Sequence, residues 1–350
     1  EKSVSVLAML ADGHVRDTIV EAIDTANRVA IDYLERNAAW TRKQTTMPDG
    51  HGGTTTVFET VATEGLTVAS FLHGTSRALD PFLHRHNVVA NSTVDADGNT
   101  KTLDATHFYR HAPAAAALAS ARLRAELTSR LGVRFIQSPS GAWEIDGIPD
   151  EAIRVFSKRS NEIGEAFNEM VDQLGYDTTA ADLRDIAAID TRDDKIPTSI
   201  EELLAGWTTQ AEAAGLDRDR IDRCFGQPGH VIEHLDDDQT AELYRFLDGP
   251  HGVTESASVF TRVDVIQSVT RWRRTDADGV TRLVVVDPVE VERVTDRYLA
   301  SNAVVTLDAT AAQADAAIIR GDGKTVSTRP VETFTTVSYT HLTLPTNREV

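Results

Sequence analysis

Apolar and polar residues follow two different patterns at the start of the chain. From Lys2 to Met9 they alternate, and Val4 and Val6 are β-branched, which is typical of a strand. From Val15 to Leu34 the apolar residues recur every three or four positions, so that one side of a helix would be apolar. The pattern predicts a strand followed by a long helix.

Turn residues separate further strand and helix patterns in the first 150 residues. Two strands are predicted on either side of the Pro-Asp-Gly and Gly-Gly turn at residues 48–53, and a hairpin is predicted about the Pro-Ser-Gly turn at residues 139–141. An alanine-rich helix is predicted to end at Gly132. We expect residues 1–150 to form an α+β unit with an antiparallel sheet and long helices.

The pattern changes after residue 150. Residues 151–259 contain helical patterns joined by short polar links, and no clear strand is predicted before about Leu283. Residues 260–336 are predicted to form a small region that contains strands. The final residues, 337–350, continue no earlier pattern, and we interpret them as a translated sequencing adaptor rather than a native disordered terminus. The predicted fold is an α+β unit followed by a mostly helical region.

The net charge of −19 is distributed unevenly along the chain. Residues 1–130 contain 13 Lys/Arg and 15 Asp/Glu, so nearly all of the excess negative charge lies in residues 131–350. Because like charges repel over a Debye length, a polyanionic partner is disfavoured mainly by the second part. Seven of the eleven histidines also lie within residues 1–130, which makes this part the place to look for chemistry.

The cysteine count and the longest apolar runs indicate the cellular compartment of the protein. The single cysteine, Cys224, excludes an internal disulfide, and we expect a packed thiol in a reducing environment. No apolar run approaches about 18 residues, and no signal-peptide pattern is present, so membrane insertion and export are not expected. These features predict a cytoplasmic protein.

Three histidines lie close together in the stretch FLHGTSRALDPFLHRHNVVAN, residues 71–91. On a strand, His84 and His86 project to the same face because successive side chains alternate. If a hairpin is centred between Ala78 and Leu79, His73 lies directly opposite His84, and the three imidazoles converge. Three neutral imidazoles can hold a divalent cation with open positions for water or substrate, which is the catalytic pattern. Isolated strand histidines are otherwise ordinary surface or core residues.

Other polar residues of this stretch have a functional and an ordinary interpretation. Asp80 could accept a hydrogen bond from an imidazole N–H, although an Asp before Pro is common in turns. Arg77 could hold an anionic ligand, although a single Arg in a turn is usually solvated. Asn91 could contact substrate or simply end the strand.

This stretch closely resembles the metal-binding motif of conjugative relaxases of the TrwC/MobF type, members of the HUH endonuclease superfamily. The resemblance extends over nearly the whole chain to residue 336. Arg85 departs from the family pattern, which usually has a small residue there; its side chain is expected to point away from the metal and to contact a phosphate or nothing. The matching positions are Phe71, His73, Ser76, Arg77, Asp80, Pro81, Leu83, His84, His86, Val88 and Asn91.

The resemblance implies a fold and an activity. The fold would be an HUH palm over residues 1–150, a helical part of the relaxase domain over 151–259, and a linker toward a helicase over 260–336. His73, His84 and His86 would hold a divalent metal ion (Mg, Mn or Zn) that grips the scissile phosphate while a tyrosine attacks it, leaving a 5′-phosphotyrosine intermediate. Arg77 and Lys2 are carried over as possible phosphate contacts.

The resemblance also implies partners and a location. The substrate would be single-stranded or supercoiled plasmid DNA at an origin of transfer. The relaxosome and the coupling proteins of type IV secretion would be partners. The protein would act in the bacterial cytoplasm, without membrane insertion, and the intact family protein enters the recipient cell.

Two family features have no match in the sequence. The nucleophilic tyrosine of the family lies upstream of the segment matched by residues 2–7, so we expect it before residue 1; Tyr33 and Tyr109 are interpreted as packing residues. This fragment is therefore expected to bind metal but not to nick, and its binding of DNA is left open. Residues 318–325 lack the first glycine of a phosphate-binding loop, so no nucleotide site is predicted. A cupin-like or non-haem iron three-histidine site, and a DNA-binding module without metal, remain as alternatives.

Overall fold

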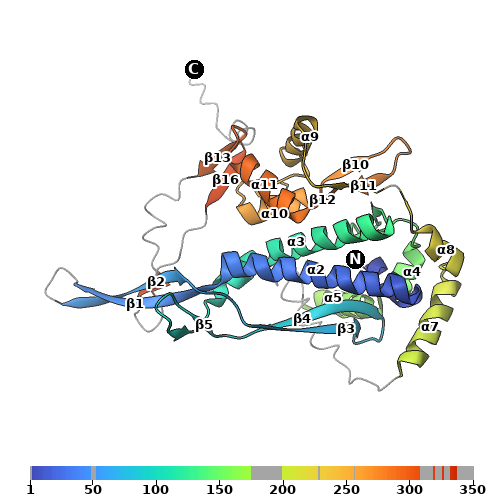
Figure 1. Ribbon diagram of the computed structural model, residues 1–350, viewed down its shortest axis with the longest axis horizontal. Helices are drawn as coiled ribbons and strands as arrows, with labels where there is room; N and C mark the ends of the chain where they lie inside the picture. The colour runs from blue at the N-terminus through green and yellow to red at the C-terminus, as the bar shows by residue number, and fades with distance from the viewer. Residues whose placement is uncertain are drawn as a thin grey trace.

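The computed structural model of the chain describes residues 2–48, 53–174, 199–227, 229–255, 257–307, 318–319, 325–326 and 332–336. Helices and mainly antiparallel sheets confirm the predicted α+β class (Figure 1). The helix pattern predicted at residues 178–192 and the tail at residues 337–350 lie outside the described residues. None of the described helices is both long enough and apolar enough to span a bilayer.

The helices of the described residues vary from one turn and a half to more than seven turns. Their bounds are α1 Lys2–Leu10, α2 Gly13–Ala38, α3 Ala105–Leu131, α4 Asp150–Val155, α5 Lys158–Leu174, α7 Ile200–Ala213, α8 Arg218–Arg223, α9 Asp237–Leu247, α10 Arg262–Val269 and α11 Pro288–Leu299.

The strands form several small sheets rather than one large one. Those of the first half are β1 Trp40–Pro48, β2 Thr54–Ala62, β3 Val68–Thr75, β4 Pro81–Val89, β5 Thr93–Val94, β6 Thr100–Lys101, β7 Phe135–Gln137 and β8 Trp143–Ile145. Those of the second half are β9 Val231–Ile232, β10 Arg273–Thr275, β11 Thr281–Leu283, β12 Val285–Val286, β13 Val304–Leu307, β14 Ile318–Ile319, β15 Thr325–Val326 and β16 Thr333–Thr336.

The first element is a helix, α1, and the predicted strand at Lys2–Met9 is wrong. Every residue from Ser3 to Ala8 is buried, so the alternation does not mark one buried face. The two serines serve neighbouring strands instead: the Ser3 hydroxyl lies 2.5 Å from Glu144 of β8, and Ser5 Oγ accepts the N–H of Leu83 in β4 at 3.0 Å. Short apolar runs cannot be assigned by periodicity alone, and here packing on all sides decided the outcome.

The two long helices lie side by side and form the middle of the molecule (Figure 1). Asp12 caps α2 by accepting the N–H of Val15 at 3.0 Å, and Asp104 caps α3 by accepting the N–H of Thr106 at 3.2 Å. The predicted end of α3 at Gly132 is confirmed, because this glycine adopts the left-handed conformation (φ 64°) that terminates a helix.

Two β-hairpins lie between α2 and α3 in the chain. β1 and β2 pair antiparallel over their full length, as the turn chemistry predicts, and form a ribbon that projects from the body (Figure 1). β3 and β4 form the second hairpin, in which His73 pairs with His84, so the predicted register is confirmed. Leu83 packs against the core formed by α1, α3, β7 and β8. The helices therefore support one face of the β3–β4 hairpin.

A four-stranded sheet of order β10-β11-β7-β8 joins segments that are distant in the sequence. The predicted β7–β8 hairpin is confirmed, and Ile136 of β7 pairs with Arg282 of β11. The expectation of no strand before about Leu283 is wrong, since β9 and β10 precede it. These strands are two or three residues long, too short for a periodic signal. The division of the chain at residues 150 and 260 stays a prediction.

Candidate metal centre

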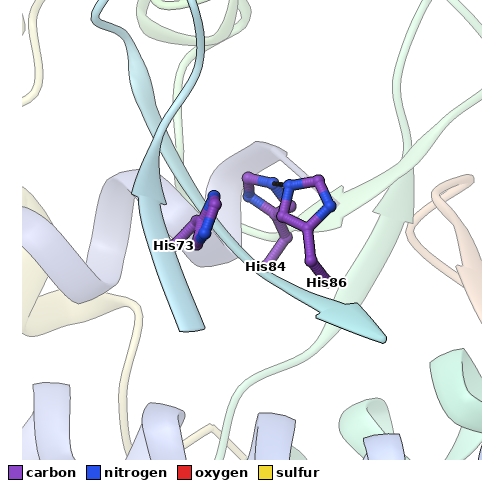
Figure 2. A group of neighbouring side chains, drawn as sticks. All are labelled: His73, His84 and His86. Atoms are coloured by element: carbon purple, nitrogen blue, oxygen red, sulfur yellow. Dashed lines mark hydrogen bonds between the residues drawn. The ribbon is translucent and has the colours of Figure 1, made fainter. Parts of the chain in front are cut away.

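Three imidazoles meet on one face of the β3–β4 hairpin (Figure 2). His73 lies opposite His84, and His86 follows two positions later on the same side. One nitrogen from each ring lies within 4.8 Å of the others. The ring centroids are 5.5 Å apart for His73 and His84, 4.4 Å for His73 and His86, and 4.7 Å for His84 and His86. The face is open to solvent, so a phosphate could reach it.

The nitrogens of His84 and His86 have nearly the spacing that a shared metal ion requires. His84 Nδ1 lies 2.8 Å from the carbonyl oxygen of Phe82, which can only accept, so Nδ1 carries the proton and the neutral ring presents Nε2. His84 Nε2 and His86 Nε2 are 3.0 Å apart. Two nitrogens bound to one tetrahedral Zn²⁺ at 2.0–2.1 Å would be about 3.3 Å apart. The nitrogens of His84 and His86 therefore fit a shared divalent cation with little movement, and one nitrogen of His73 lies within 4.8 Å of both.

The turn between the two strands is held from several directions. Ser76 Oγ accepts the N–H of Asp80 at 3.1 Å, and Leu79 adopts a positive φ of 55°, the only non-glycine residue of the described chain to do so. Trp207 of α7 donates its Nε1–H to the carbonyl of Leu79 at 2.9 Å. These bonds keep the turn in a conformation that costs about 1–2 kcal/mol for an L-residue.

Asp80 lies under this turn and is fully buried. Its Oδ1 is 3.7 Å from Lys158 Nζ, and its Oδ2 is 3.5 Å from the backbone nitrogen of Arg159 at the start of α5. Oδ1 is buried without a hydrogen-bond partner among the described residues, and burial raises the pKa of this carboxyl. The contacts of Asp80 with Lys158 and Arg159 thus join the turn to α5 rather than to an imidazole.

Lys2 lies beside the same strand. Its Nζ donates to the carbonyl of Pro81 at 2.8 Å and lies 5.6 Å from the centre of the Phe82 ring. Burial lowers the pKa of Lys2, while Asp80 opposes that change. Lys2 therefore supports the start of β4, beside the ring that touches His84.

The remaining candidates lie apart from the histidines. Arg77 is exposed in the turn, and Asn91 is exposed beyond the opposite end of the hairpin. Arg85 points to the other face, as expected, but its partner is Asp24 of α2, with its Nε 2.6 Å from Oδ1. The suggested phosphate contact of Arg85 is therefore replaced by an ion pair.

Sequence reasoning missed Lys158 and Trp207, which hold the turn from more than 75 residues away. It also missed two phenylalanines on the histidine face, Phe71, which is 53% exposed, and Phe82, which is 43% exposed. The sequence did indicate the position of these phenylalanines. Side chains two apart on a strand share a face, and Phe71 and His73, like Phe82 and His84, are two apart. No local pattern signals Lys158 or Trp207.

Comparisons with known proteins agree with this geometry. The family model described as TrwC relaxase matches residues 1–214. The multifunctional conjugation protein TraI of Escherichia coli is 35% identical over 282 residues, covering 76% of this chain and 14% of that protein. The chain thus spans about a seventh of the length of this curated relative.

Two solved structures of TrwC have a similar fold. TrwC complexed with a 27-mer DNA comprising the recognition hairpin and the cleavage site has a TM-score of 0.52 and 27% identity, covering 62% of this chain and 71% of that one. The metal-bound structure of TrwC in complex with oriT DNA has a TM-score of 0.51 and 27% identity, covering 62% and 70%.

Proposed function

Because the chain belongs to the TrwC relaxase family, we propose that it contains the metal-binding part of a relaxase domain that nicks one strand of plasmid DNA at an origin of transfer. The observation that carries the proposal is the meeting of His73, His84 and His86, with one nitrogen from each within 4.8 Å of the others. The similar solved structures include a metal-bound TrwC in complex with oriT DNA.

The three histidines are the proposed metal ligands. Imidazoles suit Zn²⁺ better than Mg²⁺ or Mn²⁺, which prefer oxygen ligands, so we favour Zn²⁺ among these three. A bound divalent cation would withdraw charge from the oxygens of the scissile phosphate. The carbonyl of Phe82 orients His84 by accepting its Nδ1–H, and the paired strands hold the other two rings in register.

Single-stranded DNA is the substrate that the surrounding surface favours. Phe71 and Phe82 are exposed on the same face as the histidines, and exposed aromatic rings offer stacking surfaces for unpaired bases. Arg77 is exposed in the adjoining turn, where we propose that it contacts a phosphate. Lys2 and Asp80 are proposed to support the hairpin, and the role of Asn91 stays a prediction.

The nucleophile is not assigned to Tyr33. Its hydroxyl lies 3.2 Å from His111 Nδ1 within a core, and burial raises the pKa of Tyr33. Tyr109 is 82% exposed on α3, so its interpretation as a packing residue is wrong. The tyrosine of the family, expected before residue 1, stays the prediction for this role. Relaxosome proteins and coupling proteins of type IV secretion, and action in the bacterial cytoplasm, are proposed from the family alone.

A cupin-like site is less well supported. In a barrel of that kind, the strands that bear the histidines would continue into a larger sheet. Among the strands that the structure describes, β3 and β4 pair only with each other, and helices cover one face of the hairpin. The hairpin is therefore part of an open α+β arrangement.

Metal titration tests the site. Cobalt(II) reports its ligands by its visible spectrum, and the intact 350-residue chain is expected to bind one equivalent. His84→Ala should remove this binding, because only two imidazoles would remain. His14→Ala is the matched control, since His14 is exposed on α2 outside the cluster. Equal cobalt binding by His84→Ala and the unmodified chain would refute the site.

A further inference from the structure

A second cavity, of about 650 Å³, lies between α3, the β7–β8 hairpin and the start of β10. Three arginines line it: Arg124 from α3, and Arg271 and Arg273 before and within β10. We call it the arginine cavity. The one carboxylate that lines it, Glu255, lies 3.0 Å from His251 Nδ1. The cavity is therefore cationic in a chain whose net charge is −19.

Two arginines near the cavity form ion pairs with carboxylates. Arg274 binds Glu242 through both Nε and a terminal nitrogen, at 2.6 and 2.8 Å. Arg282 pairs with Asp276 and Asp278. Among the residues that the structure describes, Arg271 and Arg273 have no such ion pair. Their guanidinium groups remain available to a ligand.

Groups other than carboxylates hold two of these side chains. The guanidinium of Arg273 lies 5.6 Å from the centre of the Phe246 ring. Arg124 is only 8% exposed and donates to the carbonyl of Thr270 at 3.2 Å. The contact with Phe246 positions the planar group of Arg273 without neutralising it. The guanidinium groups of Arg271 and Arg273 line one cavity and repel each other, and an anion between them relieves that repulsion.

We propose that the arginine cavity binds phosphate groups of single-stranded DNA. The guanidinium fork matches a phosphate in geometry and charge better than any other side chain. A smaller cavity of about 280 Å³ lies on the helix side of the hairpin, where Leu83 and Arg85 of β4 line it, and Ser120 of α3 lines both this cavity and the arginine cavity. The arginine cavity therefore adjoins, along α3, the cavity beneath the hairpin that carries the histidines. The inference rests on the proposed function for its ligand, DNA.

The salt dependence of DNA binding tests the inference. Each phosphate contact to a single strand contributes about −0.7 to the slope of log K against log salt. Fluorescence polarisation of a fluorescein-labelled oligo(dT), with the intact chain in EDTA, is expected to show a slope reduced by about 1.4 in the double variant Arg271→Gln/Arg273→Gln. Working in EDTA separates this test from metal binding.

Matched variants separate local contacts from net charge and from misfolding. Arg245→Gln/Arg297→Gln removes the same charge from exposed sites on α9 and α11 and should leave the slope unchanged. Arg271→Lys/Arg273→Lys keeps both charges and should retain the slope while binding more weakly. An unchanged slope in the cavity variant, or an equal reduction in the Arg245/Arg297 variant, would overturn the inference.

Two further outcomes distinguish the ligands and the proposals. Displacement of the oligonucleotide by dTMP at equal phosphate concentration would assign a free-nucleotide site and overturn the strand assignment. If the unmodified chain binds no single-stranded DNA, the DNA part of the proposed function fails along with this inference. If it binds DNA and the cavity variant has the unmodified slope, this inference alone fails.

Discussion

Single residues decide how α1 is held against the strands that it contacts. Glu144 of β8 accepts the backbone N–H groups of Lys2 and Ser3 at 3.2 and 2.8 Å, which satisfies donors at the start of the helix. Ser5 Oγ accepts the N–H of Leu83 one residue before His84. Ser5 is only 3% exposed, so water cannot replace its oxygen. A hydroxyl in the core thus supports the backbone next to a proposed metal ligand.

Replacing Ser5 by Ala is expected to lower the free energy of unfolding by about 1–3 kcal/mol, because the N–H of Leu83 loses its acceptor in a buried place. Urea denaturation measures the change. Ser92→Ala is the control, since Ser92 is exposed and its replacement should change stability by less than about 0.5 kcal/mol. Equal stability of Ser5→Ala and the unmodified chain would show that the Ser5 bond contributes nothing net.

At the scale of elements, the β3–β4 turn joins three helices to the histidine hairpin. α1 reaches it through Lys2, α5 through Lys158 and the backbone of Arg159, and α7 through Trp207. The Asp80 carboxyl lies at the centre of these contacts. Its burial disfavours the ionised form, and the two lysines only partly offset that effect on its pKa.

The raised pKa of Asp80 predicts the pH dependence of Asp80→Asn. The folded chain holds the proton of Asp80 more tightly than the unfolded chain, so ionisation lowers stability as the pH rises above 3.8 and through the folded pKa. Asparagine cannot ionise. The stability of the unmodified chain relative to Asp80→Asn should therefore be greatest at acidic pH and fall toward neutrality. Urea denaturation of both chains at several pH values measures it, and parallel pH profiles would contradict the prediction.

At the scale of the whole molecule, two hydrophobic cores meet along α3. The first surrounds α1, β7, β8 and α7, and the second contains α9, α10 and α11. Leu127 of α3 belongs to the first and Leu118 to the second, so one helix connects both. Cys224 lies in the first core, and burial raises its pKa to about 11.

Cys224 is the only cysteine and therefore reports on the first core. With its pKa at about 11, roughly one thiol in a thousand is ionised at pH 8, and its sulfur is also buried. The folded chain should react with DTNB far more slowly than the chain in urea, where one equivalent should react at once. Rapid stoichiometric reaction of the folded chain would show that this core opens readily.

The sequence by itself determined the features that depend on neighbours along the chain. Strand alternation and the turn at Ala78–Leu79 place His73, His84 and His86 on one face, and glycine's freedom of φ ends α3 at Gly132. These features follow from bond geometry within a few residues. The candidate metal centre is therefore a local property of the hairpin that carries it.

Only the tertiary structure decided what depends on distant partners. α1 is a helix because β4 and β8 satisfy its serines while its other sides are buried, and Asp80 is held by Lys158, 78 positions away. The arginine cavity likewise combines α3 with β10, which joins β7 and β8 through β11. Burial and pairing between remote segments are properties of the packed chain, and no local pattern of residues contains them.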